Sequence, residues 1–106
     1  MGKKQNEIVN LIRKFLKSIK SINLDRVILF GSYARGEESE NSDVDLLIVS
    51  DDFVGTRSFE RGEEFYLNWN YDLDVDFVCL SNKELEAGRG GFGIISRALR
   101  EGVVIK

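Results

Sequence analysis

Two short motifs carry residues whose types and spacing could do chemistry: Gly31-Ser32 and Asp43-Val44-Asp45. Gly31-Ser32 directly follows the apolar run 27–30, and ten residues separate Ser32 from Asp43. A glycine lets the backbone approach a phosphate group closely, and the serine adds a hydroxyl and an amide donor. Two aspartates supply oxygen ligands for a metal ion. The sequence therefore places a candidate phosphate-binding turn close to a candidate metal-binding pair, although each motif alone also suits a plain turn or a solvated strand start.

The two aspartates of the Asp-Val-Asp unit are expected to point to the same face of a strand. Residues i and i+2 of a strand share a face, with Cα atoms about 6.5 Å apart at a rise of roughly 3.3 Å per residue. Carboxylates held together in this way repel one another, and a divalent cation relieves the repulsion. Because the chain has no histidine, these oxygen donors favour Mg²⁺ or Mn²⁺ over zinc, and a two-ion site with a spacing of about 4 Å would suit phosphoryl transfer.

A third carboxylate is expected from the run 71–78, in which acidic and apolar residues alternate. Asp74 and Asp76 would share a face of a strand there, so alternation alone leaves the choice between them open. Asp76 lies deeper in the apolar run, where a buried carboxylate needs a metal ion, hydrogen bonds or an arginine as partner. We therefore take Asp76 as the third metal ligand and as a candidate general base for an acceptor hydroxyl, with Asp74 as the alternative.

Arg35 is the basic residue closest to the Gly-Ser turn in the sequence. Its guanidinium could neutralise the charge of a triphosphate, which makes it a candidate nucleotide-binding residue. A surface salt bridge to Glu38 is the competing interpretation, and the two remain open at this point.

The composition is that of an ordinary globular chain and excludes several kinds of site. With 106 residues, 42% of them apolar and 31% charged, we expect a single domain over residues 1–106. The absence of histidine excludes imidazole zinc sites, Ser-His-Asp triads and Cys-His dyads, and Cys79, alone of its type, is expected to be a buried thiol. No apolar stretch approaches the roughly 20 residues that span a bilayer and no signal-peptide core is present, so we expect a cytoplasmic protein without a membrane partner.

The charges are distributed unevenly along the chain. The first twenty residues are basic and could form a solvated helix face or a docking surface for an acidic partner. The stretch 37–52 has only acidic charges, which disfavours a nucleic-acid partner there and favours binding through cations.

The spacing of apolar residues predicts a mixed α/β (α+β) fold, a small mixed β-sheet flanked by helices. The run 27–30, the run 43–50 and the run 73–80 read as strands, with the second buried on both faces at its centre, and 103–105 could add an edge strand. Helical patterns cover 4–19, 33–38, 58–69, a short turn at 83–86 capped by Ser81-Asn82, and 92–101, with a glycine-rich hinge at 88–91.

Taken together, Gly31-Ser32, Asp43-Val44-Asp45 and the later strand with Asp76 resemble the minimal nucleotidyltransferases of the DNA polymerase β superfamily. The resemblance covers most of the chain, from about residue 8 to 105. It implies the nucleotidyltransferase fold, with Gly31 and Ser32 on the β- and γ-phosphates of a nucleoside triphosphate. It also implies that Asp43 and Asp45 hold Mg²⁺ and that Asp76 completes the catalytic site.

Larger members of that family carry an additional helical domain for the acceptor, and this chain has no residues left for one. By resemblance, a chain of this size is the antitoxin of a toxin–antitoxin pair and works with a helical HEPN-domain protein. It would transfer AMP from ATP to a tyrosine hydroxyl of that partner. The alternatives are a non-catalytic module that binds a nucleotide or caps a partner, and transfer to a small molecule such as an aminoglycoside.

Overall fold

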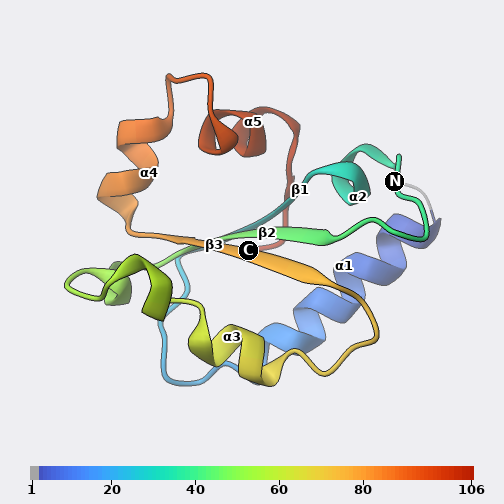
Figure 1. Cartoon of the computed structure of the whole chain (residues 1–106), viewed down its shortest axis with the longest axis horizontal. Helices are drawn as coiled ribbons and strands as arrows, with labels where there is room; N and C mark the ends of the chain where they lie inside the picture. Colours follow the sequence, from blue (N-terminus) through green and yellow to red (C-terminus); the bar gives the residue numbers. More distant parts are fainter. Residues whose placement is uncertain (1–2) are drawn as a thin grey trace.

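Figure 1 shows a computed structural model of the chain, which describes residues 3–106 and leaves the first two residues of the expected 1–106 domain outside the description. A four-stranded sheet separates two helical layers, with α1 and α3 on one face and α4 and α5 on the other (Figure 1). The helices are α1 (Lys3–Leu16), α2 (Ser32–Arg35), α3 (Glu63–Asn68), α4 (Asn82–Gly88) and α5 (Ile94–Glu101). The strands are β1 (Arg26–Phe30), β2 (Val44–Val49), β3 (Val75–Leu80) and β4 (Val103–Val104), and the 3-10 turns are η1 (Asp51–Phe53) and η2 (Ser58–Glu60).

The sheet is mixed, as the sequence predicts, and its strand order is β3-β2-β1-β4. β1 pairs antiparallel with both β2 and β4, whereas β2 and β3 run parallel. The register aligns Phe30 with Asp45 and Asp45 with Asp76. The end of β1 and the starts of β2 and β3 therefore lie at the same end of the sheet, and the candidate motifs lie there.

Strand β2 is the centre of the core. Its residues Leu46 to Val49 are completely inaccessible to solvent, which confirms the predicted burial on both faces. Val44, Leu46 and Ile48 pack toward α1 and α3, and Leu47 and Val49 pack toward α4 and α5. By this alternation, Asp45 points to the α4/α5 face, and so does Asp76, since its neighbours Val75 and Phe77 pack on the other side.

Helix α1 forms because apolar residues recur at spacings of three and four along one face, and that face buries Ile12 and Phe15 completely. It ends at Leu16, three residues before the predicted Ile19, where the chain tightens into turns closed by the amides of Lys17, Ser18 and Ile19. Ile19 remains buried in the core beyond the helix end. Among residues 3–106, every helix is too short or too polar to cross a membrane.

The predicted helix 58–69 is in fact two pieces, η2 and α3. Gly62 lies at the junction, directly before α3. Its low helix propensity explains why one continuous helix does not form there. Phe65 is buried against the rings of Phe15 and Phe77, with centroid distances of 6.5 and 5.5 Å. Tyr66 is half exposed, because it lies at the outer edge of β3 with its ring against Phe77.

Helix α4 begins as predicted at a capped position. The hydroxyl of Ser81 accepts a hydrogen bond from the Glu84 amide, and the Glu84 carboxylate accepts one from the Ser81 amide. The helix continues to Gly88, two residues past the predicted turn. The glycine-rich segment then connects α4 to α5 on the face of the sheet to which the candidate carboxylates point.

Candidate active site

Gly31 occupies a position that no other residue suits. Its φ of +78° and ψ of −156° fall in a region that residues with a Cβ rarely adopt. A Cβ built on Gly31 would overlap Oδ2 of Asp45 and lie 3.2 Å from its Cγ. The turn after β1 and the carboxylate on β2 are therefore in direct contact, and the two sequence motifs form one site.

Ser32 begins α2, a single helical turn that Gly36 closes in the left-handed conformation. This turn is shorter than the predicted helix 33–38. Its buried Tyr33 is tied to α1, because the side-chain amide of Gln5 donates to the carbonyls of Tyr33 and Ala34 at 3.1 and 2.7 Å. The Gly31-Ser32 backbone is thus held by the core on one side and by Asp45 on the other.

Asp45 and Asp76 are neighbours across the parallel pair β2–β3 and point to the same face. Adjacent strands lie about 4.8 Å apart, so the two side chains start from backbone positions at that spacing. Partial burial and the negative charges of Asp76 and Asp43 raise the pKa of the Asp45 carboxyl above its ordinary value of 3.8. Burial and the neighbouring negative charges therefore both disfavour the ionised form of Asp45.

The register places Asp76, rather than Asp74, next to Asp45. The reason given from the sequence was wrong, however, because Asp76 is exposed and not buried. β3 is an edge strand, and the face that carries Asp76 is open to solvent at this end of the sheet. The ionised carboxylate therefore stays solvated and costs little free energy of folding. Its role as the third site residue stays a prediction, now supported by its position rather than by its burial.

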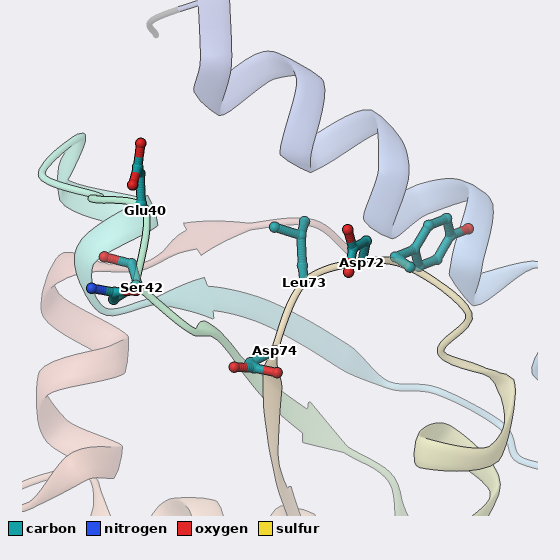
Figure 2. A pocket seen from close by; sticks show the side chains of 7 residues that line it. Glu40, Ser42, Asp72, Leu73 and Asp74 are labelled. Atoms are coloured by element: carbon teal, nitrogen blue, oxygen red, sulfur yellow. The ribbon is translucent and has the colours of Figure 1, made fainter.

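Asp74 instead lines a cavity of about 390 Å³ at the end of the sheet. Figure 2 shows Glu40 and Ser42 on one wall and the segment from Asp72 to Asp74 on the other, with helix α1 behind. The lining contains three carboxylates and no basic side chain; its residues are Glu40, Asn41, Ser42, Tyr71, Asp72, Leu73 and Asp74. A phosphate group would therefore need an accompanying cation to enter this cavity.

Arg35 lies close enough to Asp45 for its positive charge to offset part of the rise in the pKa of that carboxyl. Its Nε donates to Glu37 at 2.9 Å and its Nη1 reaches Glu101 on α5 at 3.4 Å. The hydrogen bond to Glu37 is the largest of the effects that raise the pKa of Arg35. The salt bridge to Glu38, one of the two interpretations from the sequence, is wrong in its partner, because Arg35 pairs with Glu37 and Glu101 instead. Its guanidinium stays partly exposed beside the site.

Within residues 3–106, no three aspartate, glutamate or cysteine side chains converge in a geometry ready for a metal ion. The donors nevertheless fit Mg²⁺ or Mn²⁺, since they are carboxylates only. Partial burial and the neighbouring carboxylates raise the pKa of Asp45, and a bound divalent cation would favour its ionised form. Cys79 is no competing ligand, because burial raises its pKa to about 12.

The sequence reasoning missed the residues that hold the outer edge of β3. The Phe77 amide donates to the hydroxyl of Tyr66 at 3.1 Å, and the Cys79 carbonyl accepts from Arg61 at 3.3 Å. Arg61 also pairs with Glu84 and is almost fully buried. Arg61 lies two residues before a helix, and nothing in the local sequence indicates that it binds a strand edge. The hydroxyl of Tyr66, by contrast, could have been expected to need a hydrogen-bond partner.

The family model described as "Nucleotidyltransferase domain" matches residues 9–105. The chain belongs to this nucleotidyltransferase family. The match runs from the middle of α1 to the residue that follows β4.

Three known proteins illustrate the relationship. "Protein adenylyltransferase MntA" of Thermococcus cleftensis is 32% identical over 100 residues, which cover 93% of each chain. "Putative protein adenylyltransferase MJ0141" of Methanocaldococcus jannaschii is 59% identical over 46 residues, which are 41% of this chain and 46% of that protein. A crystal structure described as a toxin–antitoxin with AMP-PNP is 27% identical, with a TM-score of 0.59 over 96% of this chain and 72% of that one. The nucleotidyltransferase fold expected from the resemblance is confirmed. The segment aligned with the M. jannaschii relative spans less than half of that protein.

Replacing Gly31 by alanine tests the contact with Asp45. We expect Gly31→Ala to lower the free energy of unfolding by about 2–4 kcal/mol, since it adds backbone strain and a clash. Gly36→Ala, also at positive φ (+71°) but with open space around it, should cost only about 1 kcal/mol. Urea unfolding measures both. In an Asp45→Ala background the cost of Gly31→Ala should fall. An unchanged cost would show that the contact with Asp45 does not contribute to the loss of stability.

The raised pKa of Asp45 predicts a pH dependence of stability in the presence of a chelator. A raised folded-state pKa stabilises the fold below the unfolded value of about 3.8, and this stabilisation is lost as the pH rises through the folded-state pKa. Asp45→Asn should therefore be more stable than the wild type at pH 7, with the difference vanishing below about pH 3.8. Unfolding curves from pH 3 to 8 measure this, with Glu7→Gln on α1 as the charge control. A pH-independent difference would contradict the arrangement.

Proposed function

We propose that this chain is a magnesium-dependent protein adenylyltransferase that moves AMP from ATP to a hydroxyl group of an acceptor protein. The observation that carries the proposal is the contact of Gly31 with Asp45, with Asp76 in register beside it. The glycine turn suits phosphate groups, and the paired carboxylates suit a divalent ion. The two features lie within about one strand spacing of each other. Nucleotide transfer needs both, because the divalent ion would neutralise charge on the phosphates that the turn binds.

The relatives support the choice of nucleotide and acceptor. One relative that aligns along nearly its whole length is named a protein adenylyltransferase. A structure of similar fold is described as a toxin–antitoxin with AMP-PNP, an ATP analogue. We infer by the same comparison that the chain is the antitoxin of such a pair. By the family resemblance alone, residues 1–106 would form one catalytic domain, and the acceptor would be a helical HEPN-type toxin in the cytoplasm.

The chain's own residues would divide the binding of ATP between them. The backbone at Gly31 and the amide and hydroxyl of Ser32 would bind the β- and γ-phosphates. Arg35, exposed on one side, would add a positive charge by exchanging its contacts with Glu37 and Glu101 for a phosphate oxygen. Such an exchange costs little because both ion pairs lie at the surface.

Asp43, Asp45 and Asp76 would hold Mg²⁺, one ion or two. The bound cation would neutralise charge on the phosphates and lower the pKa of the attacking hydroxyl. Asp76 would accept the proton as the acceptor oxygen forms its bond to the α-phosphorus, and the bond from that phosphorus to the pyrophosphate oxygen breaks. The products are an AMP–protein ester and pyrophosphate, and the proton passes from Asp76 to solvent.

Transfer of label tests the proposal. The purified protein is incubated with ATP labelled on the α-phosphate, Mg²⁺ and a lysate of the source cells. We expect one labelled protein band whose label resists denaturation. Asp43→Asn, Asp45→Asn and Asp76→Asn should each reduce the rate at least about 100-fold while the folded structure persists, since each removes a ligand or the base. Glu7→Gln should leave the rate unchanged.

Three results would contradict the proposal. Full activity in the aspartate variants would remove the roles assigned to those residues. Binding of Mg²⁺–ATP by calorimetry without any labelled protein would instead indicate a nucleotide-binding module without transfer activity. Label on a small molecule rather than a protein would replace the acceptor class.

A further inference from the structure

The peptide bond between Gly31 and Ser32 lies at the centre of the proposed phosphate turn. Its carbonyl oxygen accepts two hydrogen bonds inside the turn, from the amides of Ala34 and Arg35 at 3.1 and 3.2 Å. In a planar trans peptide the C=O and N–H groups point in opposite directions. The Ser32 amide is therefore directed out of the start of α2, away from the body of the turn.

The amides at the start of the turn are free to donate. Among residues 3–106, neither the Ser32 amide nor the Tyr33 amide donates to a protein acceptor. A phosphate oxygen accepts from such amides only when they point toward it, because a hydrogen bond weakens steeply as its angle closes. The affinity of the turn for phosphates thus depends on what fixes the orientation of its peptide planes.

The peptide units that bind the Gly31 carbonyl are themselves held by Gln5, in the first turn of α1. One unit carries the carbonyl of Tyr33 and the amide of Ala34, and the next carries the carbonyl of Ala34 and the amide of Arg35. The side-chain amide of Gln5 donates to both carbonyls, at 3.1 and 2.7 Å. Figure 1 shows the start of α1 beside α2. Each peptide unit thus links a bond from Gln5 to a bond with Gly31.

Helix α2 is too short to fix these carbonyls by itself. The last four carbonyls of a helix have no partner within it, and α2 has only four residues. The Tyr33 carbonyl receives one further bond, a long one of 3.4 Å from the Gly36 amide. The Ala34 carbonyl accepts from Gln5 alone in the part of the chain that the structure describes. Packing of the buried Tyr33 ring fixes where the turn lies, but the tilt of its peptide planes depends on Gln5.

The hydrogen bonds form a chain that ends at the donor for phosphate. It runs from the Gln5 amide through two peptide units to the Gly31 carbonyl, and the same peptide bond carries the Ser32 amide. Hydrogen bonds in such a chain polarise one another, so that each strengthens the next. Loss of the first donor would therefore loosen the turn and also weaken its last donor.

We propose that Gln5 is a positioning residue for the phosphates of the bound nucleotide. Both hydrogens of its amide are already donated to α2, so it acts through the turn and not by contact with the nucleotide. This inference rests on the proposed function, in which Gly31 and Ser32 bind the β- and γ-phosphates. Gln5 should therefore affect ligands that carry those phosphates and leave a ligand without them unaffected.

The experiment compares Gln5→Met with Asn10→Met and the wild type. Methionine has a similar length and helix propensity to glutamine but no donor, so α1 should form in both variants. Asn10 is exposed on the same helix and serves as the control position. Calorimetry measures the binding of Mg²⁺–ATP, Mg²⁺–pyrophosphate and AMP to each protein, at a temperature well below the lowest thermal unfolding midpoint.

We expect Gln5→Met to bind Mg²⁺–ATP and Mg²⁺–pyrophosphate about fivefold more weakly or worse, with AMP affinity changed by less than about twofold. Asn10→Met should match the wild type for all three ligands.

Equal affinity of Gln5→Met and the wild type for pyrophosphate would overturn the positioning role and leave the proposed function intact. A loss for AMP as large as that for pyrophosphate would assign Gln5 to the general structure of the site and overturn the role as well. A wild type that binds neither ATP nor pyrophosphate would overturn the proposed function itself, and the inference with it.

Discussion

The close placement of two carboxylates, Asp45 and Asp76, on neighbouring strands is the constraint on which the rest of the site depends. The parallel pairing of β2 and β3 sets the two carboxylates side by side, and Asp43 adds a third negative charge. Partial burial, followed by the negative charges of Asp76 and Asp43, raises the pKa of Asp45 and disfavours its ionised form, while the buried centre of β2 holds the strands together. Gly31 adds a steric constraint, since only a residue without a Cβ leaves room for the Asp45 carboxylate.

Much of this could be predicted from the sequence because it follows local rules. Strand alternation placed Asp43 and Asp45 on one face, and the Gly-Ser turn after an apolar run marked the end of β1. The uninterrupted apolar run of β2 indicated burial on both faces, which the zero exposure of Leu46 to Val49 confirms. Ser81 was identified as a helix cap for the same reason, because a capping box is a short-range pattern.

Features that depend on pairing between distant segments could not be predicted in this way. The choice of Asp76 over Asp74 requires the β2–β3 register, and the burial expected for Asp76 was wrong because its strand proved to be an edge strand. Arg35 pairs with Glu37 and Glu101, the second being 66 residues away. Tyr66 and Arg61 cover the β3 edge through contacts that span 11 and 18 residues.

The most direct test of the three-carboxylate site is a titration of Mn²⁺ into the protein with saturating ATP, followed by calorimetry. Asp76→Asn should weaken the binding of the ion by about tenfold or more, equivalent to about 1.4 kcal/mol. Asp74→Asn, two residues away on the same segment, should change it by less than about threefold, since Asp74 faces the neighbouring cavity. Equal losses in both variants, or a larger loss in Asp74→Asn, would contradict the pairing of Asp76 with Asp45 as the basis of the site.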